Sequence, residues 1–180
     1  MTTFKDLHNF FESLRTDYLH DMVPNILAET ATEFFKQRFT YKDWEGTAWP
    51  TARYPVTAGS LMQRSGALVN SIRPKIVGPG RVVISAGDSK VPYAQIHNEG
   101  GQITVTPKMK KWAWAMHYNA GGTPKDAEPT PQAKFYKAMA LQKAGSAIIM
   151  PRRRFMGYSP SLNKQILKSL QQDYNHFLNR

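Results

Sequence analysis

The residues of this sequence best suited to chemistry are His97 and Glu99, which directly precede the glycine pair Gly100 and Gly101. A histidine and a carboxylate this close together can bind a metal ion or transfer a proton. A metal site needs three or four ligands, yet the sequence has no cysteine, no second histidine four residues from His97, and only Asp88 as a nearby third ligand. We therefore favour a half-buried, structural His97 that hydrogen-bonds the backbone of the glycine turn. A hydrolase site is the weakest hypothesis, and we expect no metal and no cofactor.

Three consecutive arginines, Arg152, Arg153 and Arg154, form a second chemical feature. Guanidinium groups bind phosphates and carboxylates through paired hydrogen bonds, so this run suits DNA or an acidic protein surface. Pro151 should end the preceding strand, and Phe155 should turn into the core. Arginines held between two such points are predicted to contact a neighbouring subunit, with DNA as the less favoured partner.

A third feature is the cluster of three lysines within residues 108–111, followed by Trp112 and Trp114. Basic residues interleaved with aromatic rings are typical of single-stranded nucleic acid binding, because the charges follow phosphates and the rings stack on bases. In a helix, however, Trp112 shares a face with Met116 and Trp114 points elsewhere. The two rings would not form a continuous platform, so we favour a core or interface role.

The formal net charge of +11 is unevenly distributed along the chain. Residues 1–46 contain 5 Lys or Arg and 8 Asp or Glu, a net charge of −3, whereas residues 47–180 contain 19 and 5, a net charge of +14. A basic body of this kind attracts nucleic acid or an acidic protein surface. A solvated basic face explains the charge about as well.

Composition predicts a single domain over residues 1–180 that folds in a reducing compartment. A chain of this length buries roughly two thirds of its unfolded surface, and the absence of cysteine excludes a disulfide framework. The first residues lack the apolar core of a signal peptide, and no apolar run approaches the ~20 residues of a membrane span. We therefore expect a protein that is soluble in the cytosol when it is made, without a membrane partner.

Helical periodicity dominates the first forty residues. Apolar side chains recur every three or four positions over residues 4–18 and again over residues 21–39, which predicts a helical hairpin or one long bent helix. Pro24 is tolerated if it follows an Asp21 cap. Residues 41–55 should be an extended surface segment, in which Trp44 and Trp49 either pack back on the body or anchor a neighbouring subunit.

The rest of the chain alternates between short strands and helices. We predict a short helix from Ala58 to about Ile72, broken or capped near Ser65 and Gly66. It is followed by a strand pair at 75–78 and 81–86 around a reversal at 78–80, and by a half-buried strand at 102–106. Helices at 107–117 and 132–144 form an inserted helical segment over 107–145, followed by a buried strand at 147–150. Ser161 is expected to cap the last helix. This order predicts an α+β fold, in which N-terminal and C-terminal helices cover a mostly antiparallel sheet.

Three short motifs occur in order over about two thirds of the chain. The first motif is a leucine followed by Ser-Gly-x-Leu and then Ser-Ile. The second motif is Tyr-Ala-x-Ile-His-x-x-Gly-Gly, and the third is Pro-x-Arg-x-Phe-x-Gly-x-Ser. Their structural positions are Ser65, Gly66, Leu68, Tyr93, His97, Gly100, Gly101, Pro151 and Phe155. In this order, and closed by a helix, they resemble the phage virion morphogenesis family, the tail-completion and neck proteins of Mu-like and lambda-like phages.

The resemblance implies a structural virion protein and not an enzyme. Such a protein joins head to tail as one subunit of a homo-oligomeric ring at the head-proximal end of the tail, with a hexamer favoured over a dodecamer. Its partners would be other neck, connector or tail proteins, with DNA possible in the lumen. It would be located in the virion, and in the host cytoplasm during assembly. The alternative hypothesis is a basic nucleic-acid-binding module.

Overall fold

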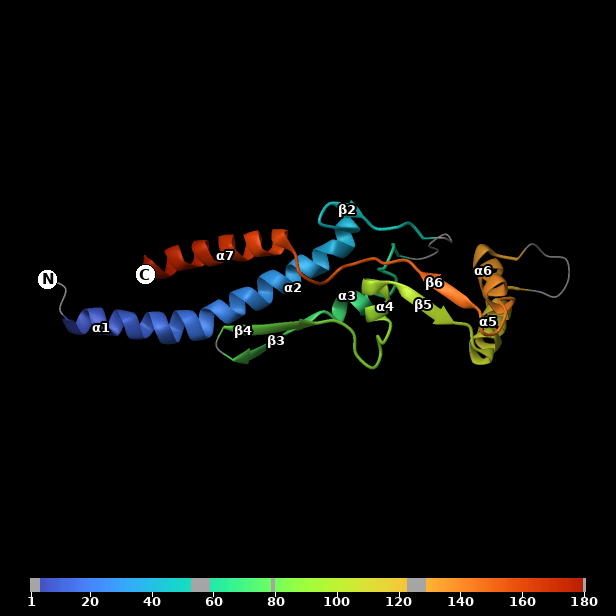
Figure 1. The fold of residues 1–180 in the computed structure, drawn as a ribbon, viewed down its shortest axis with the longest axis horizontal. Helices are drawn as coiled ribbons and strands as arrows, with labels where there is room; N and C mark the ends of the chain where they lie inside the picture. Colours follow the sequence, from blue (N-terminus) through green and yellow to red (C-terminus); the bar gives the residue numbers. More distant parts are fainter. Residues whose placement is uncertain (1–3, 53–58, 79, 123–128, 180) are drawn as a thin grey trace.

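The computed structural model describes residues 4–52, 59–78, 80–122 and 129–179. The protein is an α+β structure with 55% helix and 15% strand, as the sequence predicts. Its elements are arranged along one long axis (Figure 1). The N-terminal helix lies at one end of this axis, and a helical hairpin lies at the other.

The N-terminal region is one continuous helix made of α1 (Phe4–Ser13), a π-helical segment η1 (Leu14–Met22) and α2 (Val23–Tyr41). The N–H of Val23 donates to the carbonyl of Tyr18, five residues back. This wider turn lies directly before Pro24, whose ring and missing N–H an uninterrupted α-helix accommodates poorly. Of the two predicted alternatives, one long helix is therefore correct and a helical hairpin is not. The predicted Asp21 cap is wrong, because the backbone passes through this region without leaving helical angles.

The C-terminal helix α7 (Pro160–Leu178) packs beside the N-terminal helix and runs back toward the N-terminus (Figure 1). Tyr18 fixes their far ends together: its ring centroid lies 5.4 Å from that of Tyr174 and 5.1 Å from that of Phe177. Its hydroxyl donates to the carbonyl of Leu170 at 3.0 Å. Aromatic pairs of this geometry stabilise a contact beyond the area that they bury.

The cap of α7 differs from the prediction. Ser159, which is buried, accepts a hydrogen bond from the N–H of Leu162 at 3.0 Å, whereas the predicted cap Ser161 bonds only the Glu45 carboxylate. Pro160 occupies the first helical position, where its missing N–H costs nothing. The hydroxyls of Ser159 and Ser161 both donate to Glu45 and thereby lower the pKa of that carboxyl.

The strands form three separate antiparallel ribbons. These are β1 (Asp43–Trp44) with β2 (Thr47–Ala48), β3 (Arg73–Gly78) with β4 (Arg81–Ser85), and β5 (Gly101–Thr104) with β6 (Ala147–Met150). The predicted single sheet is therefore wrong, because β5 and β6 lead away from α2 while β3 and β4 pack on it (Figure 1). The predicted pairing of 75–78 with 81–86 is confirmed, although Pro79 in its reversal lies outside the described residues.

The β5–β6 ribbon carries the inserted helical hairpin, α5 (Pro107–Asn119) and α6 (Pro131–Ala140), as predicted. The side chains of Thr106 and Thr130 cap the two helices. The ribbon and hairpin are called the arm below. The strand predicted to be buried is not, since Ile149 in β6 is 65% exposed. A two-stranded ribbon without a covering layer cannot bury both faces.

The core lies where α2 meets the middle of the chain. Phe39 and Phe155 are fully buried with ring centroids 5.0 Å apart, and Ile72 is buried in the same cluster. The helix predicted from Ala58 is confined to α3 (Ala67–Asn70), because residues 60–63 form a tight bridge. Ala58 and Pro55 lie outside the described residues.

Because Ser159 is the buried cap of α7, its replacement should cost more stability than replacement of the nearby Ser161. Ser159→Ala should lower the free energy of unfolding by about 1 kcal/mol, because the Leu162 N–H then loses its acceptor. Ser161→Ala should change it by less than about 0.5 kcal/mol, since Ser161 is exposed. Urea unfolding followed by circular dichroism measures both, and equal losses would contradict this assignment of the cap.

Candidate functional site

The second and third sequence motifs meet at the C-terminal end of α4 (Ala94–Glu99). The N–H of Arg153 donates to the carbonyl of His97 at 2.8 Å. The Oδ1 atom of Asn98 accepts hydrogen bonds from the N–H groups of Phe155 and Met156, each at 2.9 Å. These three bonds, which we call the α4 junction, hold residues 153–156 against α4.

Gly100 lets the two segments approach this closely. Its φ is +72°, and a Cβ at this position would lie 3.0–3.1 Å from the backbone and Cβ of Arg152. Such a contact is tighter than most real Cβ contacts, so Arg152 would have to shift by a few tenths of an ångström, and L residues rarely adopt this φ. The glycine pair in the second motif therefore allows contact with the third motif.

Arg153 is an internal residue and not a subunit contact. It is 6% exposed, its Nε donates to the carbonyl of Pro50 at 2.8 Å, and its Nη2 donates to that of Thr51 at 2.9 Å. Burial lowers the pKa of its guanidinium group. Arg153 ties the segment after β2 to the α4 junction, which removes it from the surface available to a neighbour.

The other two arginines lie in different surroundings. Arg154 is half-buried, and its guanidinium carbon lies 4.7 Å from the centre of the Trp44 ring, a cation–π contact. Arg152 is exposed, and its Nη2 lies 3.4 Å from Glu99. An exposed pair at this distance contributes little to stability. Arg152 is thus the member of the run that a partner can reach.

The two tryptophans of residues 41–55 also pack on their own chain. Trp49 is 6% exposed and donates from its indole N–H to the carbonyl of Arg154 at 2.7 Å. Trp44 is half-buried and stacks on Phe35. Packing back on the body is therefore the correct alternative for Trp49, which is not available as a subunit anchor, while Trp44 keeps only part of its surface exposed.

His97 is held by its backbone and not by its ring. Its buried Nδ1 has no hydrogen-bond partner, and the bond that joins His97 to residues beyond the glycine turn is the one that its backbone carbonyl accepts from Arg153. Burial, and then the nearby Arg153 charge, lower the pKa of His97. Among the described residues, no three His, Cys, Asp or Glu side chains lie close enough together to hold a metal ion. His97, Glu99 and Asp88 do not form the metal site considered above.

Sequence reasoning missed Asn98, the residue that makes the α4 junction. It occupies an unspecified position of the second motif, between His97 and Glu99. Only its residue type could have indicated this role, since asparagine near the end of a helix commonly hydrogen-bonds backbone groups of the adjoining turn. Nothing in the sequence indicates that its partners are N–H groups 57 and 58 residues away.

Residues of all three motifs line one groove between the body and the arm, with a volume of about 1100 Å³. The motif residues on its walls are Ser65, Gly66, Leu68, Tyr93, His97, Pro151 and Arg153. Its remaining walls come mainly from β5, β6, α5 and α6. We call this the arm groove.

The arm groove is apolar and rich in methionine. Four of the eight methionines of the chain line it: Met62, Met109, Met139 and Met150. The flexible, polarisable side chain of methionine adapts to apolar partners of different shapes. The groove therefore suits hydrophobic docking better than catalysis.

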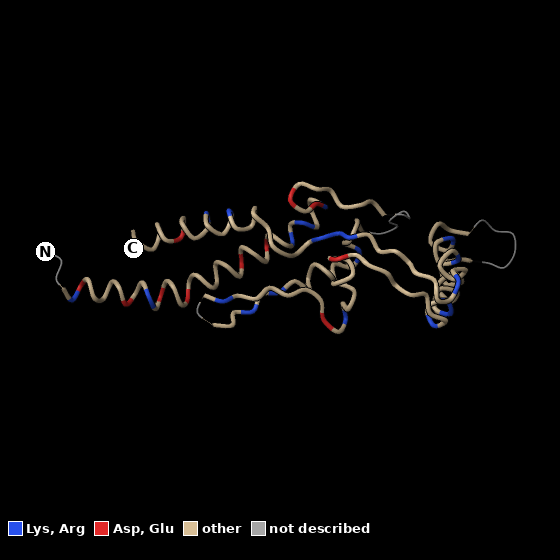
Figure 2. The backbone as a smooth tube through the Cα atoms, viewed as in Figure 1, with Lys and Arg blue, Asp and Glu red and all other residues tan. Residues whose placement is uncertain are grey.

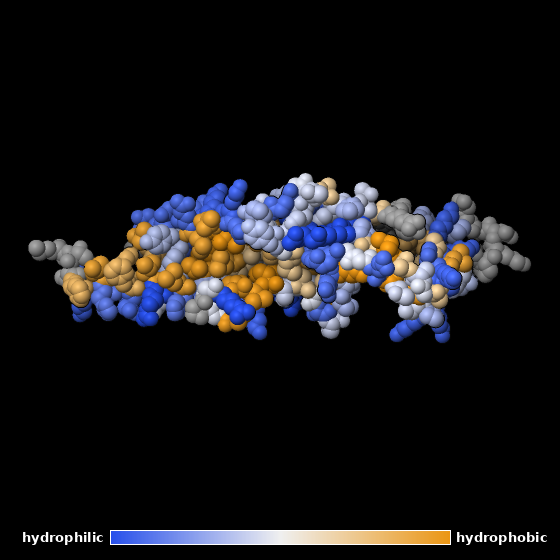
Figure 3. Space-filling view, in the orientation of Figure 1, coloured by the Kyte–Doolittle hydropathy of each residue, from blue (hydrophilic) through white to orange (hydrophobic). Residues whose placement is uncertain are grey.

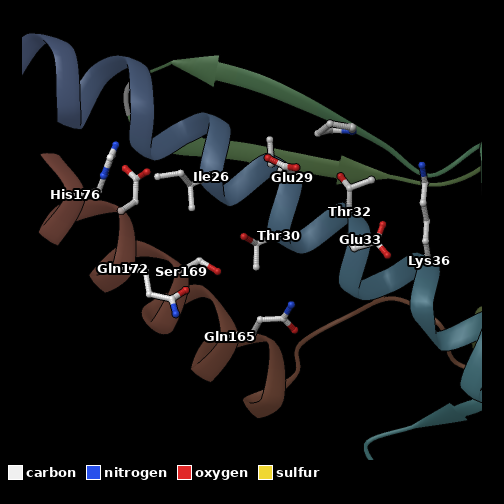
Figure 4. Close-up of a pocket in the computed structure, with 13 residues that line it drawn as sticks. Ile26, Glu29, Thr30, Thr32, Glu33, Lys36, Gln165, Ser169, Gln172 and His176 are labelled. Atoms are coloured by element: carbon white, nitrogen blue, oxygen red, sulfur yellow. The ribbon is translucent and has the colours of Figure 1, made fainter.

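A second cleft, of about 850 Å³, lies between α2 and α7 beside β3. Its walls are largely polar: Figure 4 shows Thr30 of α2 and Ser169 and Gln172 of α7 on its facing sides. Buried oxygens of Thr32 and Asp173 lack hydrogen-bond partners. We assign no chemistry to this cleft.

The aromatic residues of α5 do not form the base-stacking surface considered above. Trp112 packs its edge on Tyr136 of α6, with ring centroids 5.6 Å apart. Trp114 stacks on Tyr118 along the same helix, with centroids 6.1 Å apart. The two indoles thus have separate partners, in agreement with the helical spacing.

No protein-family model, curated protein or solved structure matches the chain. Within the described residues, the helices are too short or too polar to cross a bilayer. The candidate site therefore has to be interpreted from its own chemistry and from the sequence motifs.

The α4 junction predicts that Asn98 is important for stability. Asn98→Ala leaves the N–H groups of Phe155 and Met156 without their acceptor, which should lower the free energy of unfolding by about 2 kcal/mol. Asn98→Asp keeps an acceptor oxygen and should recover most of this loss. Chemical unfolding measures both variants, and a neutral Asn98→Ala variant would contradict the role given to the junction.

The lowered pKa of His97 predicts a stability that depends on pH. Between the folded pKa and the ordinary value of 6.5, the unfolded chain binds the proton more readily, so stability falls as the pH drops below that value. His97→Gln should reduce the loss of thermal stability between about pH 7 and pH 5. The control His8→Gln, at an exposed position of α1, should leave the pH dependence of stability unchanged. If His97→Gln also leaves it unchanged, His97 is not the residue responsible.

Proposed function

We propose that the chain is a structural phage virion protein, a tail-completion or neck component that forms a ring at the head-proximal end of the tail. The observation that carries this proposal is the large apolar surface that a single chain leaves exposed at both ends. The motif resemblance supplies the virion context. The contact between the second and third motifs at the α4 junction, and the presence of all three motifs along the arm groove, support the alignment with that family.

The exposed surface is too large for a self-sufficient monomer. The chain has a solvent-accessible surface of 12318 Å², whereas a compact monomer of 20.4 kDa exposes about 8,800 Å². Long helices and isolated ribbons leave faces that their own chain does not cover. Proteins of this kind gain their missing burial from neighbours.

Much of the uncovered surface is apolar. On α1, Phe4 is 88% exposed and Phe11 is 57% exposed, and no residue of this helix is buried. Figure 3 shows hydrophobic residues along this end of the molecule. At the other end, Trp112 and Ile149 of the arm are also exposed. Apolar patches at two separate places indicate two contacts per chain.

Two different contact surfaces on one chain favour a ring. When the surface of one subunit binds a different surface on the next, each added copy repeats the same rotation, and a suitable rotation closes the assembly. The resemblance favours six copies. The acidic first 46 residues and the basic remainder (Figure 2) add attraction between unlike ends of successive copies.

The proposal assigns no catalytic reaction to the chain. Its basic residues, with Arg152 the most accessible of the arginine run, would face an acidic partner in the neck or DNA in the lumen. The partners would be adjoining neck, connector or tail proteins, and the location would be the virion.

The ring predicts a solution mass that is a multiple of the chain mass. Native mass spectrometry of the purified protein should give a single closed oligomer, and negative-stain electron microscopy should show annular particles. A nucleic-acid-binding module would instead remain monomeric and bind DNA with an affinity that falls steeply with salt. A chain that stays monomeric and fails to enter virions would contradict the proposed function.

A further inference from the structure

We propose that helix α1 of one copy docks its apolar face into the arm groove of the next copy. This inference rests on the ring proposed above and names the contact that builds it. The two surfaces belong to the same chain, and no other described element covers either of them. Their shapes, their chemistry and their positions in the molecule each favour the pairing.

The apolar face of α1 has the spacing of a docking helix. Phe4, Leu7 and Phe11 lie at positions i, i+3 and i+7, which places them along one side of the helix. Leu7 is 46% exposed, and its two aromatic neighbours are more exposed still. Three large side chains in a row on an unburied helix match the anchors that amphipathic helices insert into grooves.

The arm groove has the character of a helix receptor. Its four methionines give it an adaptable apolar wall, and Trp112 and Ile103 add large flat surfaces. Methionine-rich grooves accept amphipathic helices because their side chains repack around different anchors. At about 1100 Å³, the groove slightly exceeds the range of about 300–1,000 Å³ for small-molecule sites.

Charge complements this apolar match. The segment formed by α1 and η1 has four acidic residues and two Lys or Arg, whereas α5 and α6 have five lysines and no Asp or Glu. Figure 2 shows the acidic residues along the N-terminal helix and the basic residues gathered on the arm. Opposite fields around an apolar contact speed its formation and select its orientation. Pairing α1 with another α1 would instead bring like charges together.

The groove cannot receive the α1 helix of its own chain. The continuous helix from Phe4 to Tyr41 is roughly 57 Å long at about 1.5 Å per residue. Its packing against α7 and the β3–β4 ribbon directs α1 away from the arm (Figure 1). The contact must therefore join two copies. Because the two surfaces differ, the contact is directional and can propagate around a ring.

Site-directed cross-linking tests the contact directly, because the natural chain has no cysteine. In the double variant Leu7→Cys, Met139→Cys, mild oxidation of the full-length assembled protein should give a ladder of covalent oligomers that ends at the ring size. The matched control Leu167→Cys, Met139→Cys uses a leucine on α7 that is more exposed than Leu7, 67% against 46%, and should give no ladder. Oxidation in denaturant should remove the ladder from the test variant.

A second variant separates docking from folding. Phe4 is 88% exposed, so Phe4→Asp should leave the fold and the thermal midpoint unchanged while weakening self-association at least about tenfold. Tyr158→Asp, at a residue that is 74% exposed outside both surfaces, should assemble normally. Sedimentation velocity across a concentration series measures both variants.

The outcomes distinguish this inference from the proposed function. Annular particles without the Leu7–Met139 ladder, or with undiminished assembly of Phe4→Asp, would overturn the docking contact and leave the ring in place. A strictly monomeric wild-type protein would also overturn the docking contact. Virion incorporation of that monomer would then decide the proposed function separately.

Discussion

The attachment of residues 153–156 to α4 is the constraint on which the rest of the molecule depends. Asn98 accepts two backbone N–H groups, and Arg153 donates from its backbone to α4 and from its side chain to the segment after β2. These bonds place Phe155 in the core against Phe39. They also fix where α7 starts and where the arm leaves the body, because β6 ends just before this segment.

The same attachment explains why the chain is extended and not compact. The β5–β6 ribbon projects from one side of the α4 junction, and α7 returns along α2 on the other. Within the described residues, neither the arm nor α1 packs extensively against another element of the body. The energy that a compact domain gains from burying these faces is therefore available for contacts between chains, where apolar burial is the main driving force.

In the proposed ring, the arm groove and α1 would serve assembly while the centre of the chain serves folding. Residues near the α4 junction, such as Trp49 and Arg153, are committed to the inside of the chain. Residues at the ends, such as Phe4 and Ile149, remain exposed. This division places the buried packing at the centre of the molecule and exposed apolar residues at its ends, which under the ring proposal would be the contact surfaces.

The sequence by itself determined the local elements, and the tertiary structure decided which residues are available to a partner. The helical character of the first forty residues, the β3–β4 hairpin and the helical arm follow from periodicity and turn residues, which act over a few neighbouring residues. The three motifs were recognisable for the same reason. The separation of the strands into three ribbons was not, because strand pairing depends on partners distant in the chain. The choice of one continuous N-terminal helix over a helical hairpin came from the structure.

The roles within the arginine run were likewise hidden: three identical side chains became an exposed, a half-buried and a buried residue because the α4 junction turns each toward different surroundings. Burial is a property of the whole packing arrangement, so no local pattern could distinguish Arg152 from Arg153 or reveal the partners of Asn98.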